Sequence, residues 1–276
     1  MSGELFMGVD IGSTASKCVI LRGDAVAAKA VVGVGAGTSG PGRVMAEALQ
    51  GASATLKDIR YIVATGYGRN TLREADSELS ELSCHARGAS YFFPGVRTVI
   101  DIGGQDAKAM RLSPEGRMLN FVMNDKCAAG TGRFLDVMAR VLEVEVEQLA
   151  ELDALSTVQV RISSTCTVFA ESEVISQLAA GTKARDIIAG IHRSVASRAA
   201  GLVRRVGVLP RVVMTGGVAR NAGVVRALSA ELGVEVETSA MAQFAGAMGA
   251  ALIAKERAGA QQTSSGSRPE PDVHQA

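Results

Sequence analysis

Short apolar runs alternate along the chain with longer segments in which apolar residues recur at helical spacing. Glycine or polar turns bound the short runs, as is typical of strands. We expect strands at Leu5–Val9, Lys17–Leu21, Ala30–Val34, Tyr61–Ala64, Thr98–Ile102, Ala107–Leu112, Leu119–Met123, Val158–Ile162, Arg211–Met214 and Val234–Glu237. We expect helices at Arg43–Leu49, Arg69–Glu78, Gly132–Leu142, Thr167–Ala180, Arg185–Val206, Ala219–Leu232 and Gln243–Ala258. This alternation predicts an α/β fold with helices packed on sheets.

Two segments of the chain are similar to each other. The first, VDIGSTASKCVIL, contains Asp10 and Lys17, and it aligns without a gap with IDIGGQDAKAMRL, which contains Asp101 and Lys108. Each copy has the pattern of a β-hairpin: a strand, a tight glycine turn and a second strand. A weaker similarity relates VATGYGRN to VMTGGVARN, in the same order. The pairs together predict a duplicated α/β unit, with chance recurrence of glycine turns as the alternative.

The two hairpins have the residue types of a phosphate-binding site. Their glycine turns leave backbone N–H groups accessible to a phosphate chain. Asp10 and Asp101 end their strands, where carboxylates can hold hydrated Mg²⁺ and orient an attacking water. Ser13 and Thr14 add hydroxyl donors, and Gln105 is suited to positioning water. The alternative is an ordinary hairpin in which Asp and Gly only favour the turn.

The order of these motifs carries a wider resemblance. DIGSTASK, DIGGQD and MTGG, with a closing AGAMGAAL, are similar to the phosphate-1, phosphate-2, adenosine and connecting segments of the actin/hexokinase/Hsp70 (ASKHA) ATPase superfamily. Longer motifs, above all NDKCAAGTGRFLDVMA and SSTCTVFAESEVIS, resemble the BadF/BadG/BcrA/BcrD ATPase family. That family holds the activators of 2-hydroxyacyl-CoA dehydratases and the ATPase subunits of benzoyl-CoA reductase. The matches extend from residue 8 to about residue 250, and the chain looks closest to the 2-hydroxyglutaryl-CoA type.

The resemblance implies an actin-like ATPase fold, with two duplicated RNase-H-like lobes around a nucleotide cleft. Lobe I would span residues 1–95 and lobe II residues 96–244, and a helix over 243–258 would return to lobe I. Residues 260–276 are rich in Ser, Pro and Gln, which predicts a disordered tail. Asp10, Asp101 and Gln105 would be catalytic. ATP would be bound by Gly12, Ser13, Thr14, Ala15, Ser16, Lys17, Gly103, Gly104, Asp106, Gly130, Gly216, Gly217, Arg220 and Gln243.

The chain has four cysteines and no C-x-x-C pair, so spacing alone favours buried, reduced thiols. The resemblance changes this for Cys127 and Cys166, because their counterparts in relatives ligate iron. Each precedes a predicted helix, whose N-terminus favours an anionic cluster. A [4Fe–4S] cluster needs four cysteines, so a symmetric homodimer would supply the other two. Cys18 and Cys84 are expected in the core. The adjacent His85 would point away from Cys84, since neighbours on a helix diverge.

The resemblance further implies an ATP-dependent reductase component. It would take one electron from ferredoxin or flavodoxin and deliver it to a 2-hydroxyacyl-CoA dehydratase, with ATP, Mg²⁺ and one [4Fe–4S] cluster per homodimer as cofactors. An ATPase subunit of benzoyl-CoA reductase is the alternative within the family. A small-molecule kinase and a regulatory actin-like ATPase without redox chemistry remain as alternatives from other classes.

Composition and motifs limit other functions. Lys and Arg total 29 against 28 Asp and Glu, and aromatic residues are 4%, so nucleic-acid binding is not expected. The first residues have no secretory pattern and no apolar run reaches a membrane span, which predicts a cytoplasmic protein away from the membrane. Gly35–Gly40 matches G-x-G-x-x-G, but it follows a hairpin and precedes Pro41, so it is a weak dinucleotide signal. No Walker A motif is present.

Overall fold

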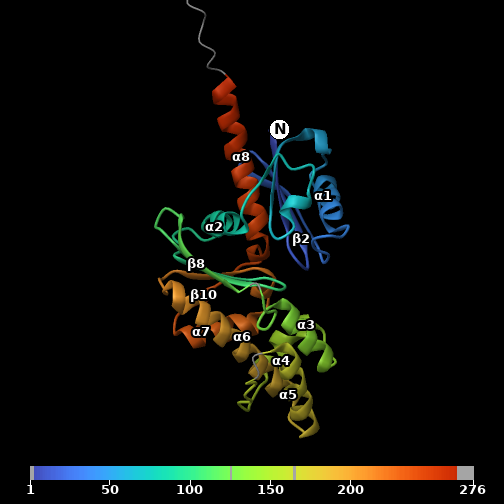
Figure 1. Cartoon of the computed structure of the whole chain (residues 1–276), viewed down its shortest axis with the longest axis vertical. Coiled ribbons are helices and arrows are strands. Elements are labelled where there is room, and N and C mark those ends of the chain that lie inside the picture. The colour runs from blue at the N-terminus through green and yellow to red at the C-terminus, as the bar shows by residue number, and fades with distance from the viewer. Residues whose placement is uncertain (1–2, 125, 164–165, 266–276) are drawn as a thin grey trace, which may run out of the picture.

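The computed structural model describes residues 3–124, 126–163 and 166–265, and two five-stranded sheets form its framework (Figure 1). The first sheet has the strand order β3-β2-β1-β4-β5. Strand β1 pairs antiparallel with β2 and parallel with β4. The strands of this sheet are β1 (Leu5–Ile11), β2 (Ser16–Arg22), β3 (Ala25–Val32), β4 (Ile59–Thr65) and β5 (Ser77–Glu78).

The second sheet repeats this topology. Its order is β10-β9-β6-β7-β8, so that β6 pairs antiparallel with β7 and parallel with β9. Its strands are β6 (Thr98–Ile102), β7 (Ala107–Leu112), β8 (Met118–Asn124), β9 (Val212–Thr215) and β10 (Val236–Glu237).

The strand registers align the two predicted repeats. Asp10 pairs with Lys17 and Thr65, and Asp101 pairs with Lys108 and Thr215. The duplicated hairpin and the α/β class predicted from the sequence are therefore confirmed, and the weaker VATG and VMTG similarity corresponds to β4 and β9. The lobe boundaries at 95 and 244 stay predictions.

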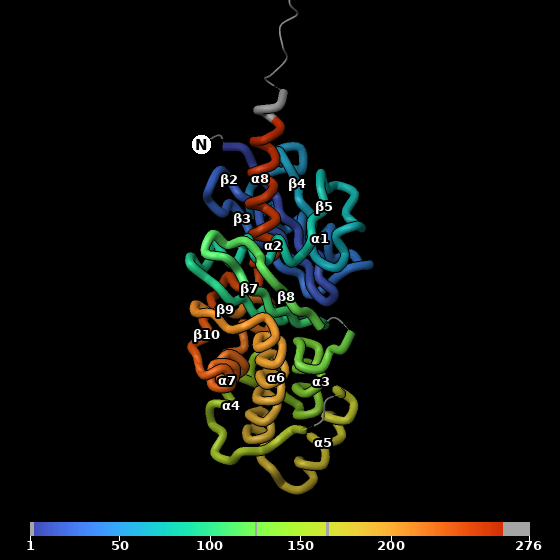
Figure 2. The backbone as a smooth tube through the Cα atoms, turned by 60° about the vertical axis from the view of Figure 1, so that its left-hand side comes forward, coloured from blue at the N-terminus to red at the C-terminus, as the bar shows by residue number. Residues whose placement is uncertain are grey.

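Helices cover both faces of each sheet. One apolar cluster joins α1 to the first sheet, and a larger one packs α3, α5, α6 and α7 on the second. In Figure 2 most of the helices, α3 to α7, accordingly lie with the second sheet in the lower part of the view. The helices are α1 (Gly40–Gly51), α2 (Glu81–Phe92), α3 (Gly132–Val141), α4 (Leu149–Ala154), α5 (Thr167–Ala179), α6 (Ala184–Val206), α7 (Ala222–Leu232) and α8 (Ala245–Ser265).

Helices α2 and α8 cross between the two sheets (Figure 1). Helix α8, which follows the second sheet in the chain, packs on β1 and β4 of the first sheet. Helix α2, which follows the first sheet, packs with Val99, Met110 and Val213 of the second sheet. Glycines let the two helices approach, because a Cβ at Gly88 or Gly249 would collide with the backbone of the opposite helix.

The sequence-based assignment was wrong in two segments. Arg69–Glu78 is not a helix: it forms a short 3₁₀ turn at Arg69–Thr71 and then β5. The carboxylate of Asp76 accepts a hydrogen bond from the Ile62 backbone at 2.7 Å, which holds this segment beside β4. Val158–Ile162 is not a strand, and the Val160 carbonyl accepts from the Arg193 guanidinium at 2.9 Å.

Two helices were missed, and one is longer than expected. Helices α2 and α4 are absent from the predicted set. Helix α8 includes residues 260–265, where composition had predicted disorder, and the rest of that predicted tail lies outside the described residues. No helix in the described part of the chain combines the length and apolar character that a membrane crossing requires.

Candidate nucleotide site and cysteine pair

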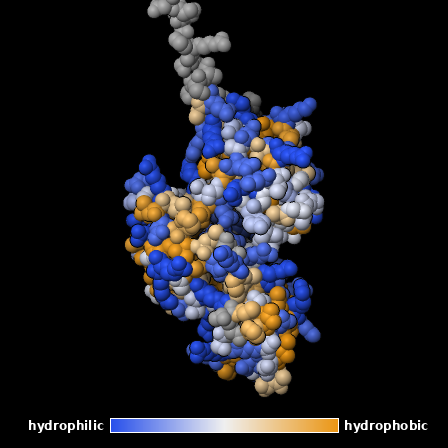
Figure 3. All heavy atoms as spheres, viewed as in Figure 1, coloured by the Kyte–Doolittle hydropathy of each residue, from blue (hydrophilic) through white to orange (hydrophobic). Residues whose placement is uncertain are grey.

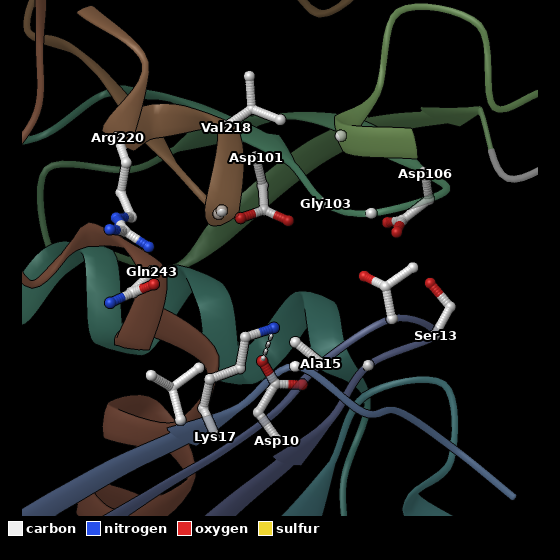
Figure 4. Close-up of a pocket in the computed structure, with 18 of the residues that line it drawn as sticks. Asp10, Ser13, Ala15, Lys17, Asp101, Gly103, Asp106, Val218, Arg220 and Gln243 are labelled. Carbon is white, nitrogen blue, oxygen red and sulfur yellow. Dashed lines mark ion pairs between the residues drawn. The ribbon is translucent and has the colours of Figure 1, made fainter. Parts of the chain in front are cut away.

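A cavity of about 620 Å³ lies between the two hairpins, at the waist where hydrophilic side chains gather (Figure 3). Figure 4 shows the first hairpin below it and the second above. Most of the residues predicted to bind nucleotide meet here although they come from three distant parts of the chain. They are Asp10, Gly12, Ser13, Thr14, Ala15, Lys17, Asp101, Gly103, Gly104, Asp106, Gly216, Gly217, Arg220 and Gln243.

Three of the predicted residues do not line this cavity. The Ser16 side chain is buried and its hydroxyl donates to the Val34 carbonyl at 2.9 Å. Gln105 is exposed at the tip of its turn. Gly130 adopts a φ of +83° and lies against Arg198 on α6, where a Cβ would come within 2.9 Å of the Arg198 Cδ. The role of each of these residues stays a prediction.

The turns that face the cavity are closed by backbone hydrogen bonds. The Gly12 N–H donates to the Ala15 carbonyl at 3.0 Å, and the Gly103 N–H donates to the Asp106 carbonyl at 2.9 Å. The turns also contact each other, since a Cβ at Gly104 would collide with the Thr14 side chain. Two tight turns of matching construction thus face each other, which suits a phosphate chain held between them.

The third wall of the cavity begins at Gly216, which has a φ of +87°. A Cβ there would meet the Ile102 backbone, so glycine is required both by conformation and by space. Farther along, apolar and acidic side chains line the cavity together, which suits a nucleobase and a ribose. This part is formed by Leu135, Asp136, Val146, Glu147, Val218 and Asn221, none of which had been predicted.

Each of the two carboxylates has a lysine from its own hairpin. The Lys17 Nζ lies 3.9 Å from Asp10, as Figure 4 marks, and the Lys108 Nζ donates to Asp101 at 3.2 Å. The Thr215 hydroxyl donates to the other Asp101 oxygen at 2.7 Å. Lys108 also pairs with Asp106 and, at 3.6 Å, with Glu81. The floor of the cavity is therefore a buried, charged network.

The network shifts the pKa of several members. Burial alone would raise the pKa of Asp101, but the charges of His85 and Lys108 hold it well below its ordinary value. Burial alone would lower the pKa of Lys108, but the surrounding carboxylates raise it above its ordinary value. The pKa of Glu81 is raised, mainly because the carboxyl is buried. Asp101 and Lys108 are therefore ionised together at neutral pH.

Sequence reasoning missed three charged residues of this network: Glu81, His85 and Lys108. Lys108 could have been found, because it matches Lys17 in the repeat. For His85, the sequence offered its neighbour Cys84, which is not part of the cavity wall, and its place in ELSCHARGAS, a segment that resembles the family. Burial would lower the pKa of His85, but the Asp101 carboxylate raises it above its ordinary value.

The expected core cysteines are confirmed as buried, and Cys127 and Cys166 are exposed. Cys166 is the N-cap residue of α5, and Cys127 lies in the loop before α3. Burial lowers the pKa of Arg198 on α6 below its ordinary value, and the nearby Cys127 and Cys166 partly oppose this shift, so both thiols lie near one guanidinium. Across the described ranges, no three or more His, Cys, Asp or Glu side chains could hold a metal ion. Two exposed thiols, one at the N-terminus of α5 and one in the loop before α3, fit half the ligand set of a [4Fe–4S] cluster.

Hydrogen bonds connect the cavity with the segment that carries Cys127. The N–H of Gly132, at the start of α3, donates to the Gly103 carbonyl at 2.9 Å. The N–H of Arg133 and the Thr131 hydroxyl donate to the Gly104 carbonyl at 2.8 and 2.9 Å. These bonds tie the turn at 103–106 directly to the start of α3.

The duplicated sheets, the facing glycine turns and the crossed helices between them define an actin-like ATPase fold. A solved ROK family glucokinase from Streptomyces griseus shares this fold, with a TM-score of 0.57 at 14% identity over 91% of this chain and 99% of that one. The family model described as the BadF/BadG/BcrA/BcrD ATPase family matches residues 7–254. The chain belongs to this family.

Several relatives match over nearly the whole chain. The (R)-2-hydroxyglutaryl-CoA dehydratase activating ATPase of Acidaminococcus fermentans is 62% identical over 254 residues, covering 91% of this chain and 97% of the relative. The solved activator of the 2-hydroxyisocaproyl-CoA dehydratase from Clostridium difficile, with bound ADPNP, has a TM-score of 0.92 at 52% identity and covers 96% and 99%. A benzoyl-CoA reductase subunit of Thauera aromatica is 33% identical over 257 residues, covering 89% and 91%.

Proposed function

We propose that this chain is an ATP-dependent one-electron donor that activates a 2-hydroxyacyl-CoA dehydratase and works as a homodimer bridged by one [4Fe–4S] cluster. The main support is the 62% identity to a dehydratase-activating ATPase over nearly the full length of both chains. The nucleotide-bearing activator structure, similar over 99% of its length, supports ATP as the ligand of the cavity.

In this proposal the two hairpins bind the phosphates of ATP. The N–H groups of the turns at 12–16 and 103–106 would contact the phosphate oxygens, and Lys17 would add a positive charge. Asp10 and Asp101 would hold hydrated Mg²⁺ and orient the attacking water. Gly216 and Gly217, with Arg220 and Gln243 beside them, would accommodate the adenosine. ATP and water would be converted into ADP and phosphate, which would then leave the cavity.

Cys127 and Cys166 of each subunit would together hold the cluster, which supplies one-electron chemistry when it is bound. The hydrogen bonds from Gly132 and Arg133 to the second phosphate turn give a direct route from the cavity to the Cys127 loop. Closure of the turns around ATP would move α3 and change solvent access to both thiols. Such a change alters the potential at which an electron leaves a cluster.

The proposed electron path starts at ferredoxin or flavodoxin and ends at the dehydratase. The second candidate, an ATPase subunit of benzoyl-CoA reductase, uses the same chemistry on a different partner, and the 33% identity to such a reductase component favours keeping it. Affinity capture of the tagged chain from cells of its source should separate the two. A dehydratase in the captured complex supports the first, whereas the other subunits of a benzoyl-CoA reductase would replace it with the second.

The redox assignment is tested by anaerobic purification of wild type and of Cys127→Ser and Cys166→Ser. Wild type should be brown and contain iron and sulfide, and both variants should lose the cluster absorbance because each removes two of four thiolates from the dimer. Cys84→Ala, which changes a buried thiol outside the pair, serves as the control. Full iron and sulfide content in either serine variant would remove that residue as a ligand, and a colourless wild type would end the cluster proposal.

A further inference from the structure

His85 on α2 occupies the floor of the nucleotide cavity between the two aspartates. Its side chain is almost fully buried, and its Nδ1 lies 3.0 Å from the Asp101 Oδ1. Its Nε2 lies 4.0 Å from the Asp10 Oδ2. In the part of the chain that the structure describes, no other side chain is within ion-pair distance of both carboxylates.

The imidazole belongs to neither hairpin. Lys17 and Lys108 each follow their own carboxylate when a hairpin moves, because they are paired with it across a β-ladder. The position of His85 is set instead by α2, whose apolar face packs on the second sheet and whose small residues pack against α8. His85 is therefore fixed at the junction of the two halves, where it touches one carboxylate from each.

Gly246, in the first turn of α8, leaves room for this contact. A Cβ there would lie 2.8 Å from the Asp10 Oδ2 and 2.8 Å from the His85 Nε2. Both distances are shorter than real Cβ contacts allow. Any side chain at this position would therefore push His85 and Asp10 apart.

We propose that His85 is a positioning residue that connects the Asp10 and Asp101 carboxylates and sets their separation for ATP hydrolysis. The imidazole does not itself contact the nucleotide in this scheme. Its Nδ1 faces Asp101 at 3.0 Å and its Nε2 faces Asp10 at 4.0 Å, so that both carboxylates would be directed toward the same phosphate. This role rests on the proposed ATP site and adds a residue to it.

The first test measures phosphate release from ATP by wild type, His85→Ala and His85→Asn. Loss of the imidazole should lower kcat about 100-fold, the effect expected when reacting groups are misplaced by about 1 Å. KM for ATP should change less than about threefold, since the phosphate turns are untouched. Asparagine can place its side-chain N–H near the Nδ1 position and so should restore part of kcat. A merely structural histidine would not give this kcat-selective loss and rescue.

The second test leaves His85 in place. Gly246→Ala should lower kcat in the same way, and Gly259→Ala, on the same helix with nothing within 4 Å of its Cβ, is the matched control and should be neutral. Thermal unfolding and ADPNP binding by dialysis report whether each variant is folded and competent to bind. Wild-type kcat in folded His85→Ala or Gly246→Ala overturns the positioning role alone. Absence of ADPNP binding and ATP turnover in wild type overturns the nucleotide site together with it.

Discussion

At the scale of single residues, two aspartates that line the cavity occupy equivalent positions in two copies of one hairpin. Duplication gave each aspartate a lysine partner across its ladder, but their surroundings differ. Asp101 is contacted by Lys108, Thr215 and His85, whereas Asp10 has Lys17 and His85 at longer distances. This asymmetry suits Asp101 to a fixed role and leaves Asp10 freer to rearrange around a metal and phosphate.

Substitution of either aspartate should suppress ATP turnover without removing the cluster. We expect Asp10→Asn and Asp101→Asn each to lower kcat by about two orders of magnitude or more, because each loses a charge that in the proposed site would hold Mg²⁺ and orient water. Phosphate release measured beside iron content checks this. Turnover at the wild-type rate in both variants would contradict the assignment of the cavity.

Some residues of the candidate site could be predicted from their neighbours in the sequence, and others could not. The turns around Gly12 and Gly103 could be predicted because glycine, Asp and strand periodicity all lie within a few residues. His85 could not, because its position between the two carboxylates depends on the crossing of α2 with both halves, which its neighbours in the sequence do not indicate. Leu135 and Glu147 were also missed, because long-range packing and not a local motif brings them to the cavity.

At the scale of elements, the close crossing of α2 and α8 holds the two halves together. At its closest approach Gly88 faces Ala245 and Gly249 faces Cys84, and Gly246 of the same helix faces His85 at the cavity floor. We call this α2–α8 contact the seam. Because the two backbones touch with no flexible side chains between them, a small movement of one helix is passed directly to the other.

A methyl group in this seam should destabilise the protein. A Cβ at Gly249 would collide with the Cys84 carbonyl, so we expect Gly249→Ala to lower the free energy of unfolding by about 1–3 kcal/mol, as overpacking typically does. Urea unfolding compared with Gly259→Ala measures this. Equal stability of the two variants would show that the helices can separate at little cost.

A polar contact centred on Asp153 connects α4, α6 and α7. Its Oδ2 lies 3.3 Å from His192 and accepts from Arg226 at 2.8 Å. Burial would raise the pKa of Asp153, but these two partners hold it below the ordinary value.

The stabilisation from Asp153 should depend on pH. Because its folded pKa is below the unfolded value of about 3.9, the stabilisation is complete above that pH and declines as the pH falls toward the folded pKa. Asp153→Asn should therefore cost about 1–3 kcal/mol at pH 7 and progressively less below about pH 4. Urea unfolding of both proteins across this range is the measurement, and a difference independent of pH would contradict the ionic account.

Among the elements, the regular ones could be predicted and the irregular ones could not. Thr98–Ile102 and Ala107–Leu112 agree residue for residue, since a short, mostly apolar run bounded by turns defines each of them. The helix predicted over Arg69–Glu78 is wrong, because a long-range hydrogen bond ties Asp76 to β4 and overrides the helical pattern of the segment. Helix α2 failed because two of its faces are buried, which weakens the amphipathic signal.

At the scale of the whole molecule, the two exposed thiols lie in the helical layer of the second half, away from the first sheet. In the proposed cluster, one chain would supply only half of the four ligands. The proposed dimer would therefore be joined by its inorganic centre as well as by protein contacts.

Removal of iron should weaken this dimer. Chelation under anaerobic conditions replaces four metal–thiolate bonds at the interface with four free thiols, so we expect a larger monomer fraction at micromolar concentration. Sedimentation velocity of the holo and iron-free protein measures it, with Cys166→Ser as a second iron-free sample. An undiminished dimer in both would argue against a bridging cluster.

The exchange of α2 and α8 between the two repeats has a consequence for dividing the chain. Each repeat ends in a helix that packs on the sheet of the other. A fragment that holds one repeat alone would therefore leave a sheet face without the helix that covers it here.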